Sequence, residues 1–160
     1  MKKERLDNLI ENLPVVLYQE PSGGPPWYLS PNVEELCGYT PDEIIAVNLW
    51  SELIHPDDVE RVKECYGTSE RSIDITYRIR PKNSKEVKWV NDVARVVRDE
   101  KGEVVSISGI SRDVTDKKKF RDNVSDNLDS AIGKLEEIND SRVDEALELI
   151  KNAREDISGL

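Results

Sequence analysis

Residues 36–44 read Leu-Cys-Gly-Tyr-Thr-Pro-Asp-Glu-Ile, and they place the end of one short helix next to the start of another. Gly38 fits a helix end, because glycine adopts the left-handed backbone conformation that closes many helices. Thr40 and Glu43 have the spacing of a capping box, and Pro41 is favoured in the first helical turn. This stretch therefore predicts two short helices joined by a tight turn.

Further start signals for helices lie on both sides of this stretch. Ser30-Pro31 predicts an N-cap with proline at the first helical position. Residues 55–58, His-Pro-Asp-Asp, predict another start, with two carboxylates at the positive end of the helix dipole. That helix is expected to run to Tyr66 and to end at Gly67.

Strand-like segments stand before and after these helices, at residues 15–20, 27–29, 74–81, 86–98 and 104–114. A Gly/Pro run separates the first two segments, and a turn at 99–102 separates the last two. Two strands, several helices and three strands in this order predict an antiparallel sheet with helices packed on one face, an α+β fold.

An amphipathic helix is predicted at the start of the chain, over residues 3–13. Leu6, Leu9, Ile10 and Leu13 recur with helical spacing, and Pro14 stops the pattern. We expect Leu6, Leu9 and Leu13 to form a small self-association face.

Several segments together resemble PAS sensor domains. Residues 36–44 are similar to the LxGYxxEEL helix junction of that family, and residues 50–58 to its W…IHPDD segment. Residues 87–90, 102 and 110–116 resemble the last two strands and the closing DIT motif. The resemblance covers residues 3–116 in order, and it implies a five-stranded antiparallel sheet in the order 2-1-5-4-3 with a cavity between sheet and helices.

The cavity implied by this resemblance has seven candidate lining residues. They are Tyr18, Leu29, Cys37, Tyr39, Trp50, Tyr77 and Trp89. Aromatic side chains can equally fill the core of a domain with a single Phe, and for most of them core filling is the favoured interpretation.

No cofactor, metal ion or catalytic residue is expected. The flavin-binding branch of the family carries a motif resembling NCRFLQ, which this chain lacks, and haem-binding members place a His in the helix that corresponds to residues 57–66, which has none. His55 is interpreted as a cap and Cys37 as core packing, and two Cys with one His are too few for a zinc site. Adjacent Asp57 and Asp58 point in different directions on a helix and form no acid–base pair. The sequence is compatible with a small ligand, whose identity it does not give.

Charge and hydropathy exclude two classes of partner. The net charge of −10 disfavours nucleic acid, whose phosphates require basic surfaces. No apolar run has the length of a membrane span, and the first residues lack the apolar centre of a signal peptide, so a cytoplasmic location is expected. Residues 121–160 carry five basic and eleven acidic side chains, a shift that predicts a boundary near residues 116–120.

The last forty residues contain two apolar stripes with spacings of four and three. The first consists of Val124, Leu128, Ala131, Leu135 and Ile138, and the second of Ala146, Ile150, Ala153, Ile157 and Leu160. A helical hairpin that dimerises into a four-helix bundle would bury both stripes. One continuous two-stranded coiled coil is the alternative. In either arrangement, Val124, Leu128, Leu135, Ile150 and Ile157 are expected at a dimer interface.

Residues 120–132 also resemble the phosphoacceptor helix of sensor histidine kinases, FxxxVSHDLRxPL. Phe120, Val124 and Ser125 match that pattern, but Asp126 stands at the position of the phosphoacceptor histidine. The resemblance therefore implies a degenerate or truncated dimerisation hairpin, with no enzymatic activity in this chain.

Together these features predict a helix at 1–14, a PAS sensor domain at 15–116 and a helical signalling segment at 117–160. The domain would pass its signal through Asp113, Val114 and Thr115 to a dimeric bundle, as the input module of a two-component-type sensor, with a kinase or other signalling protein as partner. A dimerisation scaffold without ligand is the alternative function.

Overall fold

Five antiparallel strands form one sheet in the order β2-β1-β5-β4-β3, as predicted. The structure, a computed structural model, describes residues 2–138 and 141–158. The strands are β1 (Val16–Pro21), β2 (Tyr28–Leu29), β3 (Ser72–Ile79), β4 (Lys88–Arg98) and β5 (Val104–Asp113). Because the last strand, β5, pairs with both β1 and β4, it lies at the centre of the sheet. The predicted α+β class and strand order are confirmed.

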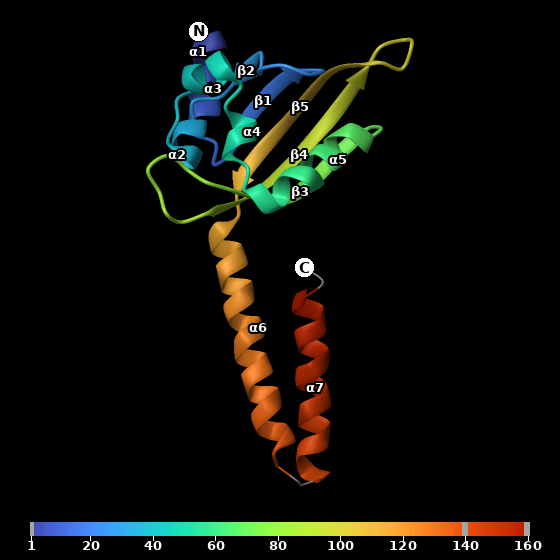
Figure 1. Cartoon of the computed structure of the whole chain (residues 1–160). Coiled ribbons are helices and arrows are strands. Elements are labelled where there is room, and N and C mark those ends of the chain that lie inside the picture. Colours follow the sequence, from blue (N-terminus) through green and yellow to red (C-terminus); the bar gives the residue numbers. More distant parts are fainter. Residues whose placement is uncertain (1, 139–140, 159–160) are drawn as a thin grey trace. The chain divides into compact units, whose positions relative to one another are not determined.

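Short helices between β2 and β3 cover one face of this sheet (Figure 1). They are α2 (Val33–Cys37), α3 (Pro41–Val47), α4 (Trp50–Leu53), the 3-10 turn η1 (Pro56–Asp58) and α5 (Val59–Thr68), and α1 (Lys2–Glu11) precedes β1. The Asn32 side-chain amide donates hydrogen bonds to the carbonyl oxygens of Glu11 and Leu13, at 3.0 and 2.8 Å. These bonds attach the end of α1 to the start of α2.

The turn between α2 and α3 has the geometry that its sequence predicts. Gly38 ends α2 with a φ of 80°, in the left-handed region. The Glu43 backbone N–H donates to the Thr40 hydroxyl at 3.3 Å, and the Thr40 N–H donates to the Glu43 carboxylate at 2.8 Å. Both bonds of the capping box are therefore present.

Two predicted helix boundaries are wrong. Helix α2 begins at Val33, and the Ser30 hydroxyl accepts a hydrogen bond from the Leu17 N–H at 2.9 Å instead of capping a helix. This bond joins the segment after β2 to β1. Gly67 does not end α5, which continues to Thr68, because one glycine inside a helix reduces its stability only modestly.

The core lies between the covered face of the sheet and the helices. Ile73, Ile75, Tyr77 and Ile79 alternate along β3 and are all buried. They pack with buried residues of the helices, namely Val33, Leu36, Cys37, Ile44, Leu53 and Val62. Trp27 is 59% exposed and belongs to no part of this core.

The chain divides into two compact units, Met1–Val114 and Thr115–Leu160. The finer boundaries at residues 14 and 116 stay predictions. The second unit contains α6 (Thr115–Glu136) and α7 (Ser141–Ser158), which pair as a hairpin. Ion pairs of 2.6 Å join Lys151 to Glu136 and Arg154 to Asp129. The continuous coiled coil is therefore not formed within this chain.

The apolar stripe of the hairpin differs in part from the predicted one. In α6, Val124, Leu128, Ala131 and Leu135 are half-buried as expected, but Ile138 is 50% exposed. In α7, the stripe consists of Val143, Leu147, Ile150 and Ile157. Ala146 and Ala153 are exposed, and Leu160 lies outside the described residues. The prediction was therefore right for Ile150 and Ile157 and wrong for Ala146 and Ala153, in whose place the larger Val143 and Leu147 are half-buried.

Candidate ligand cavity

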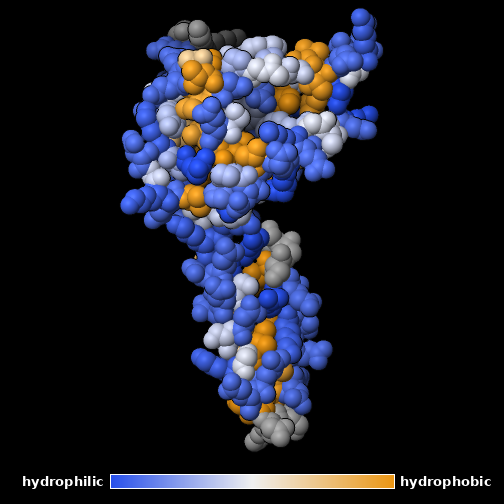
Figure 2. All heavy atoms as spheres, in the orientation of Figure 1, coloured by the Kyte–Doolittle hydropathy of each residue, from blue (hydrophilic) through white to orange (hydrophobic). Residues whose placement is uncertain are grey.

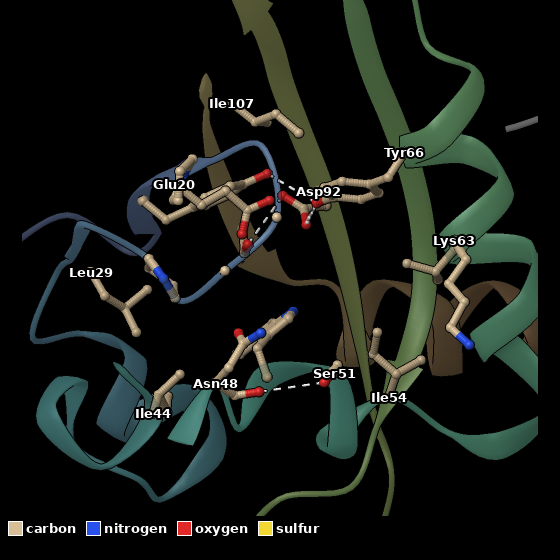
Figure 3. A pocket seen from close by; sticks show the side chains of 18 of the residues that line it. Glu20, Leu29, Ile44, Asn48, Ser51, Ile54, Lys63, Tyr66, Asp92 and Ile107 are labelled. Atoms are coloured by element: carbon tan, nitrogen blue, oxygen red, sulfur yellow. Dashed lines mark hydrogen bonds between the residues drawn. The ribbon is translucent and has the colours of Figure 1, made fainter. Parts of the chain in front are cut away.

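A cavity of about 460 Å³ lies between the covered face of the sheet and helices α3, α4 and α5. Its apolar lining includes Val16, Leu29, Ile44, Ile54, Val62, Val104 and Ile107. Glu20, Tyr66 and Asp92 lie toward one side of the cavity, and the polar residues Asn48 and Ser51 lie toward the other (Figure 3). A mostly apolar hollow with a few convergent polar groups is the usual form of a small-molecule site.

Four of the seven candidate pocket residues line this cavity, namely Tyr18, Leu29, Trp50 and Tyr77. The other three do not. Cys37 is fully buried in the core, and the Tyr39 ring lies 4.6 Å from the Lys82 amino group. Trp89 neighbours the inward-facing Val90 on β4, so it lies on the opposite face of the sheet, where Arg78 stacks on its ring at 5.7 Å.

Asp92 of β4 is the polar centre of the cavity and is 1% exposed. The Tyr66 and Tyr77 hydroxyl groups donate to its Oδ2 atom at 2.6 and 3.1 Å, and the Ser111 hydroxyl donates to Oδ1 at 3.1 Å. These donors come from α5, β3 and β5. The buried carboxylate therefore connects one helix and two strands.

Two of these donors are themselves oriented by further hydrogen bonds. The Trp50 indole N–H donates to the Tyr77 hydroxyl at 3.0 Å, and the hydroxyl groups of Tyr18 and Tyr66 are 3.0 Å apart. Because Tyr66 uses its single proton on Asp92, Tyr18 is the donor of that second pair. Each proton of the network is thus donated either to Asp92 or to a hydroxyl group that itself donates to Asp92, and the direct donors stabilise the carboxylate in its ionised form.

Burial and charge shift the pKa values of the cavity residues upward. Burial raises the pKa of Asp92, while the surrounding hydroxyl groups oppose that shift. Burial together with the nearby Asp92 charge raises the pKa of Tyr18, Tyr66 and Tyr77, so these phenols stay protonated. The pKa of Glu20 rises to about 7, first through burial and second through repulsion by Asp92.

Four cavity residues were not predicted from the sequence, namely Glu20, Tyr66, Asp92 and Ser111. One signal was available, because Asp92 shares its strand face with Val90 and Ala94, and both of these are buried. A charged side chain at an inward position of a strand is a strong indication of a polar site. Ser111 carries no such signal, because small hydroxyl residues occur on either face of a strand.

The two carboxylates at the start of α5 have a structural role that the sequence did not show. Asp58 accepts hydrogen bonds from the backbone N–H, Nε and Nη2 of Arg78, at 2.8, 2.9 and 3.0 Å. Asp57 is exposed and lies 3.3 Å from the same guanidinium group. His55 accepts the Asp57 N–H at 3.4 Å, as expected of a cap. Besides their place in the first turn, these carboxylates therefore join η1 to β3.

The residues predicted at the signal exit lie at the end of β5 and the start of α6. The Asp113 carboxylate is 3.3 Å from the Lys88 amino group, and the Val114 N–H donates to the Trp89 carbonyl oxygen at 2.8 Å. Thr115 is the first residue of α6. The chain thus passes from strand to helix with one residue between them, and that residue is hydrogen-bonded to β4.

The predicted dimer residues and the degenerate phosphoacceptor position are accessible to different degrees. Leu6 and Leu9 of α1 are 55% and 58% exposed, and Leu13 is half-buried. In the hairpin, a half-buried apolar stripe remains visible from outside (Figure 2). Asp126 is exposed, as its interpretation as a phosphoacceptor position requires.

The part of the chain that the structure describes offers neither a metal site nor a membrane-spanning helix. No group of three or more His, Cys, Asp or Glu side chains has an arrangement that could hold a metal ion. Among the same residues, no helix has the length and hydropathy that crossing a membrane requires.

Comparison with known proteins identifies the family. The PAS fold matches residues 26–111, more than half of the chain, and the protein therefore belongs to the PAS family. A methyl sulfide methyltransferase-associated sensor of Methanosarcina acetivorans is 34% identical over 110 residues, which cover 66% of this chain. The match spans about 11% of the length of that relative.

Two solved structures show similar folds. A sensory box histidine kinase/response regulator of Burkholderia thailandensis is 25% identical with a TM-score of 0.65, covering 79% of this chain and 97% of that one. The N-terminal domain of a diguanylate cyclase with a PAS/PAC sensor, from Marinobacter aquaeolei, is 27% identical with a TM-score of 0.58, covering 65% and 98%. The chain is thus a PAS domain similar to sensor domains of signalling proteins, followed by a helical hairpin.

Proposed function

We propose that the chain is a signal-input module in which a small molecule occupies the cavity and changes the state of the helical hairpin. The observation that carries this proposal is the 3.1 Å hydrogen bond from Ser111 to Asp92. Asp92 lines the cavity, and Ser111 lies on β5 two residues before that strand ends. A molecule that contacts Asp92 therefore acts directly on the strand that leads into α6.

The end of β5 is held to β4 on both faces of the sheet. On the cavity face, Ser111 donates to Asp92. On the opposite face, the Arg112 guanidinium donates two hydrogen bonds to the Asn91 side-chain oxygen, at 3.0 and 2.8 Å. Because these residues are adjacent in each strand, a shift of β4 at Asp92 moves the end of β5 as a unit. Small shifts at a ligand site can be amplified into larger changes, because packed elements switch between discrete arrangements rather than deforming continuously.

The proposed output is a dimeric hairpin. In the described part of α6 and α7 after Thr115, every apolar side chain is at least partly exposed. Two copies that pack along this stripe would form a four-helix bundle and remove the stripe from water. The similarity to kinase and cyclase sensor domains supports a two-component-type or related partner, and the exposed Asp126 supports a hairpin that does not accept phosphate itself.

A dimerisation scaffold without ligand is the second candidate function. The exposed Leu6 and Leu9 on α1 and the half-buried stripe of the hairpin favour it, because both are apolar surfaces outside the cavity. The two functions differ in whether a ligand binds in the cavity.

A binding screen separates the two functions. Cationic, neutral and anionic small molecules are added to the full chain and to a Val62→Phe variant, in which a larger side chain enters the cavity from α5. We expect compounds that raise the melting temperature of the unchanged protein and have little effect on the variant. A Val97→Phe variant, altered at an exposed position of β4, is the matched control. If no compound binds in the cavity, the scaffold function is favoured instead.

A further inference from the structure

The cavity combines two carboxylate side chains with aromatic walls. Asp92 is 1% exposed, and Glu20 of β1 is half-buried near it, close enough for the Asp92 charge to act on the Glu20 carboxyl group. In the described part of the chain, neither carboxylate forms an ion pair with a Lys, Arg or His side chain. A buried carboxylate ordinarily has such a partner, so the cavity holds negative charge without a protein cation to neutralise it.

The hydrogen-bond network around Asp92 stabilises the negative charge of its carboxylate. Its three hydroxyl donors stabilise the ionised carboxylate, and they leave Oδ1 with one hydrogen bond where a carboxylate oxygen accepts about two. Among these three hydrogen bonds one acceptor position of Oδ1 is unused, and the Tyr18 hydroxyl is a further group that acts on this carboxylate. A group that carries a proton and a positive charge fits this position best.

The walls around the carboxylates suit an organic cation. Tyr18, Trp50, Tyr66 and Tyr77 all line the cavity, and the faces of such rings attract ammonium groups. Their hydroxyl and indole protons are directed toward Asp92 or toward one another, so the ring faces remain for contact with a ligand. The apolar lining beyond them, with Leu29 and Ile44, would contact a hydrocarbon body.

An anionic ligand is disfavoured by the same geometry. Lys63 is the one cationic residue among those that line the cavity. Its side chain is 68% exposed, and its amino group lies 3.3 Å from the Glu60 carboxylate. In Figure 3 this amino group points away from Asp92. A carboxylate or phosphate in the cavity would therefore meet Asp92 and Glu20 without a compensating cation.

We propose that the cavity binds a small organic ammonium ion, with its charged nitrogen at Asp92 and Glu20 and its carbon body against the apolar lining. This inference rests on the proposed sensing function and names the chemical class of its ligand. The ammonium group would donate to the unused position of Asp92, and the tyrosine and tryptophan rings would surround it. Glu20 would gain its negative charge as the pH rises through about 7, so binding would tighten over that range.

The test uses compounds that differ only in charge. The full chain is titrated by calorimetry at pH 8 with n-butylammonium, n-butanol and butyrate, and with 2-phenylethylammonium, 2-phenylethanol and 3-phenylpropionate. We expect the ammonium member of at least one set to bind at least tenfold more tightly than its neutral and anionic counterparts. Equal or tighter binding of a neutral or anionic member in each set would overturn the proposal.

Two variants test whether the ammonium ion binds at Asp92 and Glu20. Asp92→Asn is expected to lower ammonium affinity at least tenfold, and Glu20→Gln to remove the increase in affinity between pH 6 and pH 8. Glu103→Gln, at an exposed carboxylate outside the cavity, should change neither. Since Asp92→Asn changes a buried network, Glu20→Gln and the charge series on the unchanged protein keep the test valid if that variant does not fold.

The outcomes also separate this inference from the proposed function. If a neutral or anionic compound binds and Val62→Phe abolishes that binding, the cavity still senses a ligand but not a cation. If no compound of any charge binds, both the inference and the sensing function are contradicted. Ammonium binding that persists unchanged in Asp92→Asn and Glu20→Gln would place the site elsewhere and overturn the inference alone.

Discussion

At the residue scale, the cavity is organised by a carboxylate that is 1% exposed and accepts three hydrogen bonds, from one helix and two strands. Burying an ion of this kind costs several kcal/mol unless hydrogen bonds or an opposite charge compensate for it. Asp92 accepts hydrogen bonds of this kind. No Lys, Arg or His side chain among the described residues forms an ion pair with it. Such an incompletely compensated charge is typical of a functional position rather than of a purely structural one.

The raised pKa of Glu20, to which the Asp92 charge contributes, can be tested without a ligand. Its pKa is raised from 4.5 to about 7, so the folded state binds more protons than the unfolded state between these values. Stability must therefore fall as the pH rises from about 4.5 to about 7. Glu20→Gln removes this loss, and we expect it to stabilise the protein by about 1–3 kcal/mol at pH 8 relative to its effect at pH 4.5.

Urea denaturation at both pH values measures the Glu20 effect, and Glu103→Gln is the matched control because its carboxylate is exposed. A Glu20→Gln variant whose stability relative to the parent is the same at both pH values would contradict the raised pKa.

Gly109 of β5 provides space for the tyrosine network. A Cβ atom there would lie 2.7 Å from the Tyr18 hydroxyl oxygen and 2.7 Å from the Ala94 Cβ atom. Gly109→Ala should therefore displace Tyr18 and reduce the free energy of unfolding by about 1–3 kcal/mol. In Gly67→Ala, the added methyl group meets no atom within 4 Å, and this helical substitution should be neutral or stabilising. Equal denaturation midpoints for the two variants would be inconsistent with the crowding at Gly109.

At the element scale, the 3-10 turn before α5 is held to β3 by the contact between Asp58 and Arg78. Hydrogen bonds from Arg78 lower the pKa of Asp58 from 3.8 to about 2. A lowered pKa adds stability above about pH 4, and this contribution is lost as the pH falls toward 2. We expect Asp58→Asn to reduce the free energy of unfolding at pH 7 by about 1–3 kcal/mol.

Asp57→Asn is the control for Asp58, because Asp57 is an adjacent carboxylate with 70% of its side chain exposed. It should change stability by less than about 0.5 kcal/mol. Thermal unfolding at pH 7 and pH 3 measures both variants, and a greater loss in Asp57→Asn would refute the assigned role of Asp58.

Most elements of the fold could be predicted from the sequence because their signals are local. Each of these signals acts within a few residues. The capping box at Thr40 starts α3, Gly38 ends α2, and alternating apolar residues form the buried face of β3. The role of Ser30 could not be predicted, since its hydroxyl bonds to Leu17, thirteen residues away. For the same reason the cavity was predicted only in part. Aromatic residues such as Tyr18 suggest a pocket lining, whereas the donors to Asp92 converge only through strand pairing.

In the helical hairpin, the spacing of apolar residues alone does not determine which face of α7 packs against α6. A spacing of four and three fits two neighbouring rows of α7, one with Ala146 and Ala153 and one with Val143 and Leu147. Packing against α6 selects the second row, because it contains the larger side chains and buries more apolar area. Ile150 and Ile157 belong to both rows and were identified from the sequence.

At the scale of the whole molecule, dimerisation is expected to depend on the second unit. The half-buried stripe of α6 and α7 contains more apolar side chains than the exposed face of α1, which has Leu6 and Leu9. Truncation after Asp116 should therefore weaken the dimer at least tenfold, about 1.4 kcal/mol. Sedimentation equilibrium measures both forms, with Leu6→Ser in the full chain as the control for α1. Equal dimer affinity with and without the hairpin would place the interface on the PAS unit.

The central claim is that the state of the cavity reaches α6 through β5. Hydrogen–deuterium exchange of the amides between Ser111 and Val124 tests this claim, with Val62→Phe as a filled cavity and Val97→Phe as its control outside the cavity. Filling the cavity is expected to change exchange in this segment at least threefold, in β5 and in the first turns of α6 together, while the control variant is expected to leave it unchanged. Exchange that changes in β4 and β5 but stays the same in α6 would show that the cavity and the helix are not coupled.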